Sequence, residues 1–511
     1  MFCKISSLAV YGIHSVVVAV EVDIATGLPS FDIVGLPDTA VKESKDRVKA
    51  AIKNCGYTLP VSRITVNLAP ADIRKSGPLY DLPIMIAILQ GSGQISFPTD
   101  SFAFLGELSL SGEVRHVSGV LPMVLKAKEE GFSGVFVPAQ NGAEAAVVKG
   151  IAVYPVSHFA DLIRHFSGEA TIQPLTSPPF SAESALQALD FSDVKGQTEA
   201  KRAMEIAAAG AHNMILIGPP GSGKSMLAKR LPSILPPMTF DEAIETTKIY
   251  SICGQLGEGN SLIRIRPFRA PHHTVSAVGL AGGGYNLAPG EISLAHNGVL
   301  FLDELPEFNR SVLEVLRQPM EDHMVTISRA AGQMSYPCSI MVVAAMNPCP
   351  CGYYGHPTRP CTCSSTAVAR YLSKVSGPLL DRIDLHVDVM PVEYEHLSSS
   401  EKAEPSAAIR ARVEKAREIQ LQRFEGTGIT SNARITSGLL SEMCPISDKG
   451  NSLLKAAFDS MGLSARAYDR ILKVARTIAD LEGAEVIDAP HIAEAVQYRS
   501  LDRKYWQHSV L

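Results

Sequence analysis

The 511-residue sequence has no long hydrophobic run and no marked excess of charge of either sign. The longest apolar stretch in its first half, residues 82–89, contains a proline and is far shorter than the roughly 20 residues that a membrane-spanning helix needs. The net charge of -5 and the pI near 6.3 provide no general attraction for nucleic acid or an anionic membrane. We therefore expect no membrane segment, and any polyanion must be bound by a local basic surface.

Residues 1–5 do not begin a charged segment followed by a long apolar core, so we expect no secretory leader. Nine cysteines in a chain without that signal are typical of the reducing cytoplasm. Four of the cysteines cluster, which indicates a metal site rather than disulfides. We expect a cytoplasmic protein.

The length of the chain predicts more than one domain, because a single hydrophobic core rarely serves so many residues. Prolines among serines and threonines mark one linker. We predict an N-terminal α+β domain over 1–167, a linker over 168–185, an α/β core over 186–395 and a helical lid over 396–511.

Local patterns in the two outer domains predict their elements. In the N-terminal domain, β-branched and apolar runs predict strands at 15–22, 31–34, 64–68, 102–105 and 135–137. Amphipathic segments predict helices at 38–55, capped by Asp38 or Thr39, and at 82–90 and 120–130. In the lid, helical periodicity predicts helices at 409–424, 453–460, 464–481 and 489–502.

A glycine-rich segment between an apolar run at 214–217 and a helix start is a phosphate-binding P-loop in its required context. Its residues are Gly218, Pro219, Pro220, Gly221, Ser222, Gly223, Lys224 and Ser225. The glycines allow successive N–H groups to face an anion, and Lys224 can reach the β- and γ-phosphates. The Ser225 hydroxyl can hold Mg²⁺, so this segment predicts ATP and Mg²⁺ as ligands.

Two later apolar runs end in polar residues, as strands do at the ligand-binding edge of an α/β sheet. The first run leads into Asp303 and Glu304, and the second leads into Asn347. We expect Asp303 to hold Mg²⁺ through water and Glu304 to polarise the attacking water. Asn347 is placed to orient that water, as a first sensor of the γ-phosphate.

Two arginines farther along are candidates for the same site. Arg382 fits an ordinary surface ion pair with Asp381 or Asp384, or an arginine finger that reaches the ATP of a neighbouring subunit. We favour the finger, because the order of P-loop, acidic strand, asparagine strand and arginine matches the AAA+ ATPases. Arg466 follows the helix cap Ser464, where a cation opposes the helix dipole unless an anion is near. This makes Arg466 a candidate second sensor.

The segment between the P-loop and the acidic strand is rich in arginine and is followed by three glycines, which indicates a mobile basic loop. Segments 324–328 and 333–336 predict a β-hairpin with a basic tip. The insertion and the hairpin together resemble the AAA+ clade of magnesium chelatase and the MCM helicases. In the ring helicases of this clade such loops grip DNA. The resemblance therefore implies four candidate DNA-binding residues: Arg264, Arg266, Arg269 and Arg329. In the lid, Arg470, Lys473 and Arg476 fit a solvated or DNA-facing stripe.

The clustered cysteines form two Cys-x-Cys pairs, Cys349 with Cys351 and Cys361 with Cys363. Glycines and prolines in the nine residues between the pairs favour a closed loop, so four thiolates can converge on Zn²⁺. We favour a structural Zn²⁺ over reduced free thiols. A metal with four protein ligands has no open position for catalysis.

Segments 74–79 and 106–114 are similar to those that flank the Ser–Lys dyad of Lon-type proteases. The resemblance places the nucleophile at Leu79 and the lysine near Leu121. Neither side chain can attack a carbonyl or accept a proton, so the resemblance implies a degenerate Lon-like fold without the activity.

Across nearly its whole length the chain resembles the ComM/YifB family of magnesium-chelatase-like AAA+ ATPases. The segments that carry the resemblance are the degenerate Lon-like region with 35–38, then 271–274 and 289–308. It implies a homo-hexameric, ATP-driven DNA motor, a helicase or branch migration factor on single-stranded and branched DNA. The motor would promote recombination of incoming DNA in natural transformation, with recombinase or loading partners.

Two other functions remain open at this point. A chelatase-type motor would remodel a protein partner, and its ATPase would respond to that partner and not to DNA. An ATP-dependent protease conflicts with the apolar residues at the two dyad positions.

Overall fold

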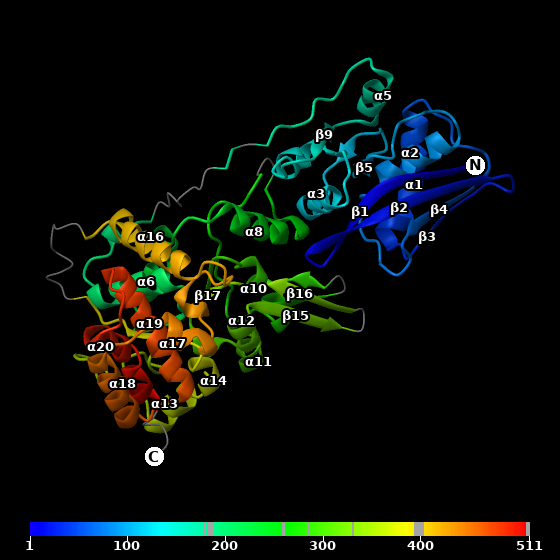
Figure 1. Ribbon diagram of the computed structural model, residues 1–511. Coiled ribbons are helices and arrows are strands. Elements are labelled where there is room, and N and C mark those ends of the chain that lie inside the picture. Colours follow the sequence, from blue (N-terminus) through cyan, green and yellow to red (C-terminus); the bar gives the residue numbers. More distant parts are fainter. Residues whose placement is uncertain are drawn as a thin grey trace. The chain divides into compact units, whose positions relative to one another are not determined.

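The computed structural model describes residues 1–177, 179–180, 189–257, 261–284, 287–329, 332–392 and 403–506 (Figure 1). The chain divides into two compact units. Unit 1 comprises Met1–Ser181 and Phe240–Ile263, and unit 2 comprises Ala182–Thr239 and Arg264–Leu511. Within the described ranges, no helix has the length and apolar character that a membrane crossing requires.

Unit 1 is built on a seven-stranded mixed sheet with the order β3-β4-β2-β1-β5-β8-β9. Its strands are β1 (Phe2–Tyr11), β2 (His14–Ala25), β3 (Ser30–Val34), β4 (Arg63–Ala69), β5 (Phe102–Phe104), β8 (Gly134–Pro138) and β9 (Ala152–Val156). The helices α1 (Thr39–Asn54), α2 (Asp81–Gly91) and α3 (Val120–Glu129) contribute side chains to one apolar core with the sheet. The predicted strands and helices of this domain are confirmed, and Asp38 caps α1 by accepting from the Val41 N–H at 2.8 Å.

The elements of unit 1 that were not predicted include β1, β9 and α5 (Phe159–Ser167). Strand β1 lies inside the sheet, between β2 and β5, although two serines interrupt its apolar pattern. Ser7 is fully buried and donates its hydroxyl to the Phe104 carbonyl at 2.9 Å. A strand of this kind is identified by its neighbours, because its own sequence does not alternate cleanly.

The segment Phe240–Ile263 belongs to unit 1, whereas we predicted an undivided core over 186–395. Its helix α8 (Phe240–Ile252) packs against α3, and the Ser251 carbonyl accepts from the Gly119 N–H at 3.0 Å. The Ser251 hydroxyl also donates to the buried carboxylate of Glu144. The helix has a weak amphipathic pattern, so its sequence does not reveal which unit covers it.

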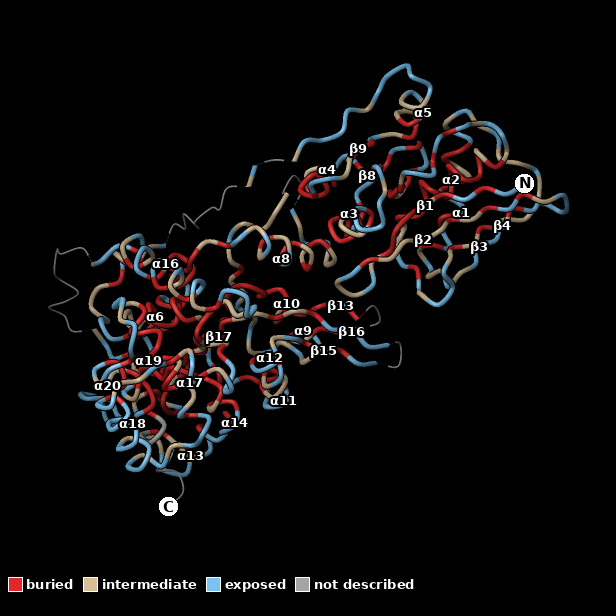
Figure 2. The backbone as a smooth tube through the Cα atoms, viewed as in Figure 1, coloured by how far each residue is buried: buried red, intermediate tan, exposed pale blue. Residues whose placement is uncertain are grey.

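Unit 2 is built on five parallel strands with the order β11-β14-β17-β10-β18. They are β11 (Phe268–Arg269), β14 (Val299–Leu302), β17 (Met341–Met346), β10 (Met214–Ile217) and β18 (Leu385–Asp388). Every residue of β10, β14 and β17 is buried, as in a sheet covered on both faces. Figure 2 labels β17 among the buried segments of this unit. The three predicted ligand-binding strands are therefore adjacent, and their carboxyl ends share one edge of the sheet.

Helices follow the sheet in the C-terminal part of unit 2: α16 (Ser406–Arg423), α18 (Asp448–Met461), α19 (Ala465–Glu482), α20 (Ala489–Gln497) and α21 (Ser500–Tyr505). They confirm the predicted helical region, and Ser464 caps α19. The interpretation of a solvated basic stripe is wrong. Arg470 pairs with the buried Asp384, Lys473 donates to the Ala433 carbonyl at 3.2 Å, and Arg476 is fully buried.

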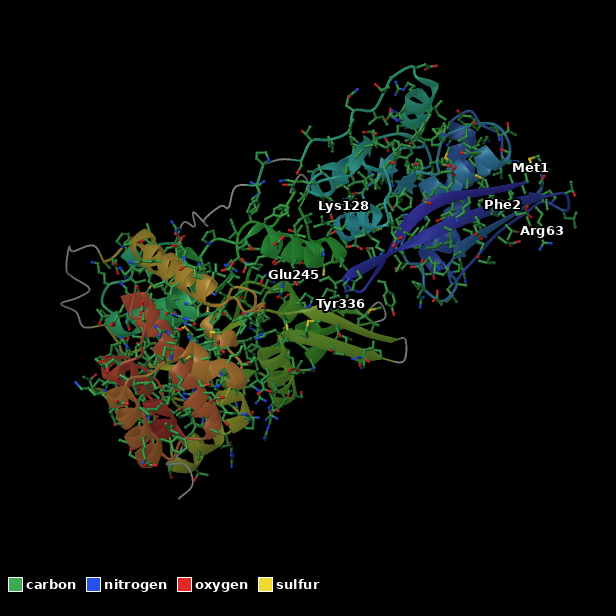
Figure 3. All side chains as sticks on the ribbon, viewed as in Figure 1. Met1, Phe2, Arg63, Lys128, Glu245 and Tyr336 are labelled. Carbon is green, nitrogen blue, oxygen red and sulfur yellow. The ribbon has the colours of Figure 1, made fainter. Side chains whose placement is uncertain are left out.

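The predicted hairpin is present as β15 (Met324–Arg329) and β16 (Gly332–Pro337), whose Tyr336 is labelled in Figure 3. Tyr336 is buried and donates to the Leu287 carbonyl at 2.9 Å, which anchors the base of the hairpin. Residues 330–331 at the tip lie outside the described residues, as do parts of the predicted linker and the boundary at 395. The predicted mobile basic loop instead contains β11, α9 (Ala277–Ala281) and β12 (Gly282–Gly283).

Candidate nucleotide site and cysteine cluster

The P-loop joins β10 to α7 (Lys224–Arg230) at the shared edge of the unit 2 sheet. Gly221 and Gly223 have φ of 77° and 93°, which favours glycine at both positions. A Cβ added to Gly218 would lie 2.2 Å from the Val389 carbonyl oxygen, so no other residue fits there. The backbone thus has the compact form that directs N–H groups toward an anion.

Lys224 is held inside this loop by three oxygen atoms. Its ammonium donates to the carbonyls of Gly218 at 2.7 Å and Pro219 at 2.9 Å, and to Asn347 Oδ1 at 3.2 Å. Burial lowers the pKa of Lys224 to about 8, and the charge of Asp303 opposes that shift. Lys224, predicted to bind phosphate, and Asn347, the predicted first sensor, therefore lie in direct contact.

Ser225 and Asp303, the two predicted Mg²⁺ ligands, lie in direct contact. The Ser225 hydroxyl donates to Asp303 Oδ2 at 2.7 Å, and Asp303 Oδ1 accepts from the Glu304 N–H at 3.0 Å. A hydroxyl and a carboxylate are hard oxygen ligands, and they lie beside a loop that faces phosphates, so this pair fits Mg²⁺ bound with a nucleotide.

Glu304 leaves the end of β14 in a left-handed conformation, with φ of 53°, and its side chain is 61% exposed. Its Oε2 lies 3.5 Å from Nδ1 of His273, whose ring is tilted by 35° against that of His272, with ring centroids 4.1 Å apart. Strand β11 pairs in parallel with β14, which places the loop after β11 beside the carboxyl end of β14. His273 is a site residue that the sequence analysis did not identify.

Gln197 is a second residue that was not identified. It immediately precedes α6 (Thr198–Gly210), and its amide nitrogen donates to the Ser222 carbonyl at 3.1 Å and the Met390 carbonyl at 2.6 Å. The segment before α6 is thereby tied to the P-loop. Its left-handed conformation, uncommon for glutamine, marks the position, but only the fold reveals that conformation, so the sequence carried no signal for Gln197.

Neither Arg382, the predicted arginine finger, nor Arg466, the predicted second sensor, contacts the P-loop within the described residues. Arg382 is 8% exposed, donates to the Pro378 carbonyl at 2.6 Å and pairs with Glu321 at 2.8 Å. Its partner is thus neither of the two aspartates considered from the sequence. Arg466 is exposed in the first turn of α19, and no contact links it to the P-loop within the described structure.

Arg266 and Arg269, both candidate DNA-binding residues, form internal contacts. Arg266 donates to carbonyls of Pro236 at 2.7 Å and Asn297 at 2.8 Å, and Arg269 forms a two-bond pair with Glu291 at 2.7 Å. Arg264 is half-buried. Arg329 is exposed at the end of β15, opposite Gly332 in the hairpin register.

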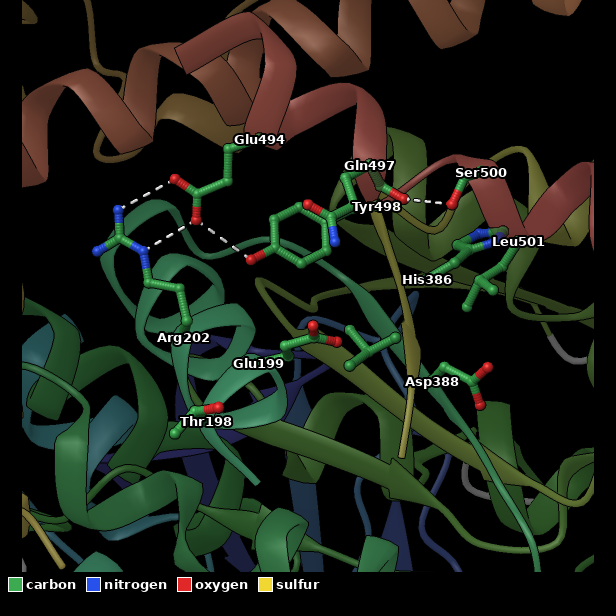
Figure 4. A pocket seen from close by; sticks show the side chains of 11 residues that line it. Thr198, Glu199, Arg202, His386, Asp388, Glu494, Gln497, Tyr498, Ser500 and Leu501 are labelled. Carbon is green, nitrogen blue, oxygen red and sulfur yellow. Dashed lines mark hydrogen bonds and ion pairs between the residues drawn. The ribbon is translucent and has the colours of Figure 1, made fainter. Parts of the chain in front are cut away.

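A pocket of about 440 Å³ lies between α6, β18 and the α20–α21 corner (Figure 4). Arg202 on its wall is bound by Glu494 at 2.9 and 3.2 Å, and Tyr498 donates to the same carboxylate at 3.3 Å. The remaining acids on its wall, Glu199 and Asp388, would repel phosphate. No P-loop residue lines this pocket, so we do not assign the nucleotide to it.

The four clustered cysteines converge as predicted. The Sγ atoms of all four lie within 4.8 Å of one another, and those of Cys349, Cys351 and Cys361 are 3.4 to 3.6 Å apart. Backbone N–H groups donate to sulfur, from Tyr354 to Cys349 at 3.3 Å and from Cys363 to Cys361 at 3.4 Å. Because a tetrahedral Zn–S4 centre has sulfurs about 3.8 Å apart, the cluster is compatible with Zn²⁺.

The parallel sheet, the P-loop at its central strand and the acidic and asparagine strand ends define a P-loop ATPase of the AAA+ class. The family descriptions agree. Subunit ChlI of Mg-chelatase matches residues 20–141, Magnesium chelatase subunit ChlI matches 190–397, and its C-terminal description matches 403–499.

Relatives that match nearly the whole chain identify the family within this class of ATPases. Competence protein ComM of Haemophilus influenzae is 44% identical over 506 residues, or 97% of each chain. YifB of Escherichia coli is 41% identical over 497 residues, or 97% of this chain and 96% of that protein. The chain belongs to the ComM/YifB family of magnesium-chelatase-like AAA+ ATPases.

The likeness to Lon proteases is confined to one part of the chain. A Lon protease of Mycolicibacterium smegmatis is 25% identical over 169 residues, or 31% of this chain and 22% of that protein. Leu79 and Leu121 are both buried apolar residues in unit 1.

Proposed function

We propose that this protein is a hexameric ATP-driven DNA motor, a helicase or branch migration factor that promotes recombination of incoming DNA in natural transformation. The observation that carries the proposal is the 97% mutual coverage with a competence protein, combined with an intact nucleotide site. The motor acts in the cytoplasm, where imported single strands meet the chromosome.

Each nucleotide-site residue has one role in hydrolysis. Lys224 leaves its carbonyl partners to bind the β- and γ-phosphates, and Ser225 with Asp303 holds Mg²⁺. Mg²⁺ held by these two residues would neutralise charge that develops on the phosphate oxygens. Asn347 orients the attacking water, and Glu304 polarises it after turning away from His273.

In the hexamer, Arg382 stabilises the transition state at the neighbouring subunit's ATP, and Arg466 senses the γ-phosphate from the lid. The finger requires the pair with Glu321 to open, since the guanidinium is buried in this conformation. Mixed rings test it: Arg382→Ala subunits should regain hydrolysis when an adjacent subunit supplies the arginine. Lack of rescue would assign Arg382 to the ion pair alone.

DNA is gripped by the hairpin β15–β16 through the exposed Arg329. Arg266 and Arg269 shape the preceding segment through their internal contacts and contribute less to DNA binding. Contacts of arginine with phosphates make DNA binding salt-dependent and largely independent of sequence. We also propose that the four-cysteine cluster binds a structural Zn²⁺.

Branch migration of a labelled three-strand junction, at low salt with Mg²⁺ and ATP, tests the motor. The wild type should resolve the junction, Glu304→Gln should bind it without resolving it, and Arg329→Ala should hydrolyse ATP with weakened DNA stimulation. A wild-type protein that hydrolyses ATP and leaves every junction unchanged would exclude the DNA motor.

The second candidate is a chelatase-type motor that remodels a protein partner, because the matching descriptions are those of magnesium chelatase subunit ChlI. ATPase rates distinguish the two functions. Stimulation by DNA supports the first, and stimulation only by a partner protein supports the second.

A further inference from the structure

The turn that carries the first cysteine pair presses against the P-loop. Gly352 follows Cys351, has φ of 84°, and donates its N–H to the Cys349 carbonyl at 3.0 Å. A Cβ added to Gly352 would lie 2.3 Å from Cδ and 2.7 Å from Cγ of Pro220. The backbone of the turn and the ring of Pro220 are therefore in contact, with no space for one methyl group.

The residues on both sides of this contact are connected to the candidate nucleotide site. Pro220 follows Pro219, whose carbonyl binds the Lys224 ammonium at 2.9 Å. On the other side, β17 ends at Met346, and only Asn347 and Pro348 separate that strand from Cys349. Met346 in turn accepts from the Gly218 N–H at 3.2 Å. A displacement of the cysteine turn would shift the P-loop and the sensor together.

We propose that the four-cysteine site is part of the nucleotide site, so that metal occupancy sets nucleotide affinity by holding Gly352 against Pro220. The proposal rests on the proposed Zn²⁺ site. With four thiolates bound to one ion, the turn is fixed and the P-loop keeps its shape without nucleotide. Without the ion, the cysteine turn relaxes, and phosphate must bind while restoring the loop, which weakens binding.

Thermodynamic linkage makes the coupling reciprocal: if Zn²⁺ strengthens nucleotide binding by a given factor, nucleotide strengthens Zn²⁺ binding by the same factor. This separates the proposal from a metal that only stabilises its own loop, for which nucleotide would leave the affinity for Zn²⁺ unchanged.

The first measurement uses the full chain, zinc-loaded and chelator-stripped, with Kd for a fluorescent ADP analogue and zinc content by elemental analysis. We expect stripping to raise Kd about tenfold, added Zn²⁺ to restore it, and saturating ADP to strengthen retention of Zn²⁺ against a chelator by a similar factor. Purified protein without zinc that fails to bind added Zn²⁺ would refute the metal site and leave the ATPase assignment intact.

A substitution tests the contact with the metal in place. Gly352→Ala should keep one zinc per chain and still raise Kd for ADP about tenfold, because the new methyl group displaces Pro220. Gly426→Ala is the matched control: Gly426 has φ of 77° and is exposed, with nothing within 4 Å of an added Cβ, so it has the same backbone strain without the contact.

Pro220→Ala removes the two ring atoms that the added Cβ would meet. In the double variant with Gly352→Ala, Kd should return to the value of Pro220→Ala alone. The inference is overturned if zinc removal and Gly352→Ala both leave Kd unchanged while circular dichroism shows an intact fold. If zinc removal unfolds the chain, the glycine series alone decides the question.

Discussion

The edge of the unit 2 sheet and the core of unit 1 use charge in opposite ways. In unit 1, Asp81 is fully buried and is neutralised by Arg47, with Nε to Oδ2 at 2.6 Å and a second bond of 3.1 Å. At the nucleotide edge, a phosphate can replace the carbonyl partners of Lys224. The side chain of Glu304 can likewise turn away from His273. The charged groups at the nucleotide edge can exchange their partners, whereas the charge of Asp81 is fixed by one internal ion pair.

The largest effect should follow from removing the exchangeable acid. Glu304→Gln should lower the ATP hydrolysis rate about a thousandfold, roughly 4 kcal/mol in the barrier, with ATP binding retained, because the amide cannot polarise water. Single-turnover hydrolysis and nucleotide Kd measure both. A proportional loss of binding would mean that Glu304 acts through the loop structure.

In unit 1 the corresponding substitution should affect stability and not chemistry. Asp81→Ala leaves Arg47 without its buried partner and should lower the free energy of unfolding by about 3 kcal/mol. Asp46→Ala, which breaks an exposed pair with Lys49 at 3.9 Å, should change it by less than about 1 kcal/mol. Denaturant unfolding measures the loss of stability, and the Kd for ADP serves as a second readout. An altered Kd for ADP in Asp81→Ala would contradict the purely structural role of this ion pair.

The buried lysine makes nucleotide affinity depend on pH. Without nucleotide the pKa of Lys224 is lowered to about 8 by burial, and a bound phosphate raises it, so binding takes up a proton above that pH. Affinity for ADP should be level below pH 8 and fall by about tenfold per pH unit above it. Titration calorimetry in buffers of different ionisation enthalpy would reveal the proton, and equal affinity at pH 7 and pH 9.5 would contradict the assignment.

The smallest effect concerns His273, whose Nδ1 lies 3.5 Å from Oε2 of Glu304. His273→Ala should raise the DNA-independent ATPase rate about threefold, roughly 0.7 kcal/mol, because Glu304 is freed to face the water. His272→Ala is the control, since His272 bonds to Thr274 instead. A lower basal rate in His273→Ala would show that the histidine supports the active position of Glu304.

Elements whose signals are local were predictable. The P-loop, the acidic strand end, the asparagine strand and the cysteine pairs are each defined by a short pattern, and the parallel sheet brings them together as expected. Predictions that depended on a side chain's partner were less successful. Arg476 and Arg269 were placed on solvated or DNA-facing surfaces, yet the first is buried and the second is bound to Glu291.

The sequence by itself determined the nucleotide chemistry, because glycine, lysine and carboxylate at fixed spacing after apolar runs permit few other structures. Tertiary structure alone decided that His273 meets Glu304, that Gly352 meets Pro220, and that α8 belongs to unit 1. These contacts join residues far apart in the chain. Nothing in the local pattern around either partner records the other, so only the folded backbone brings them within reach.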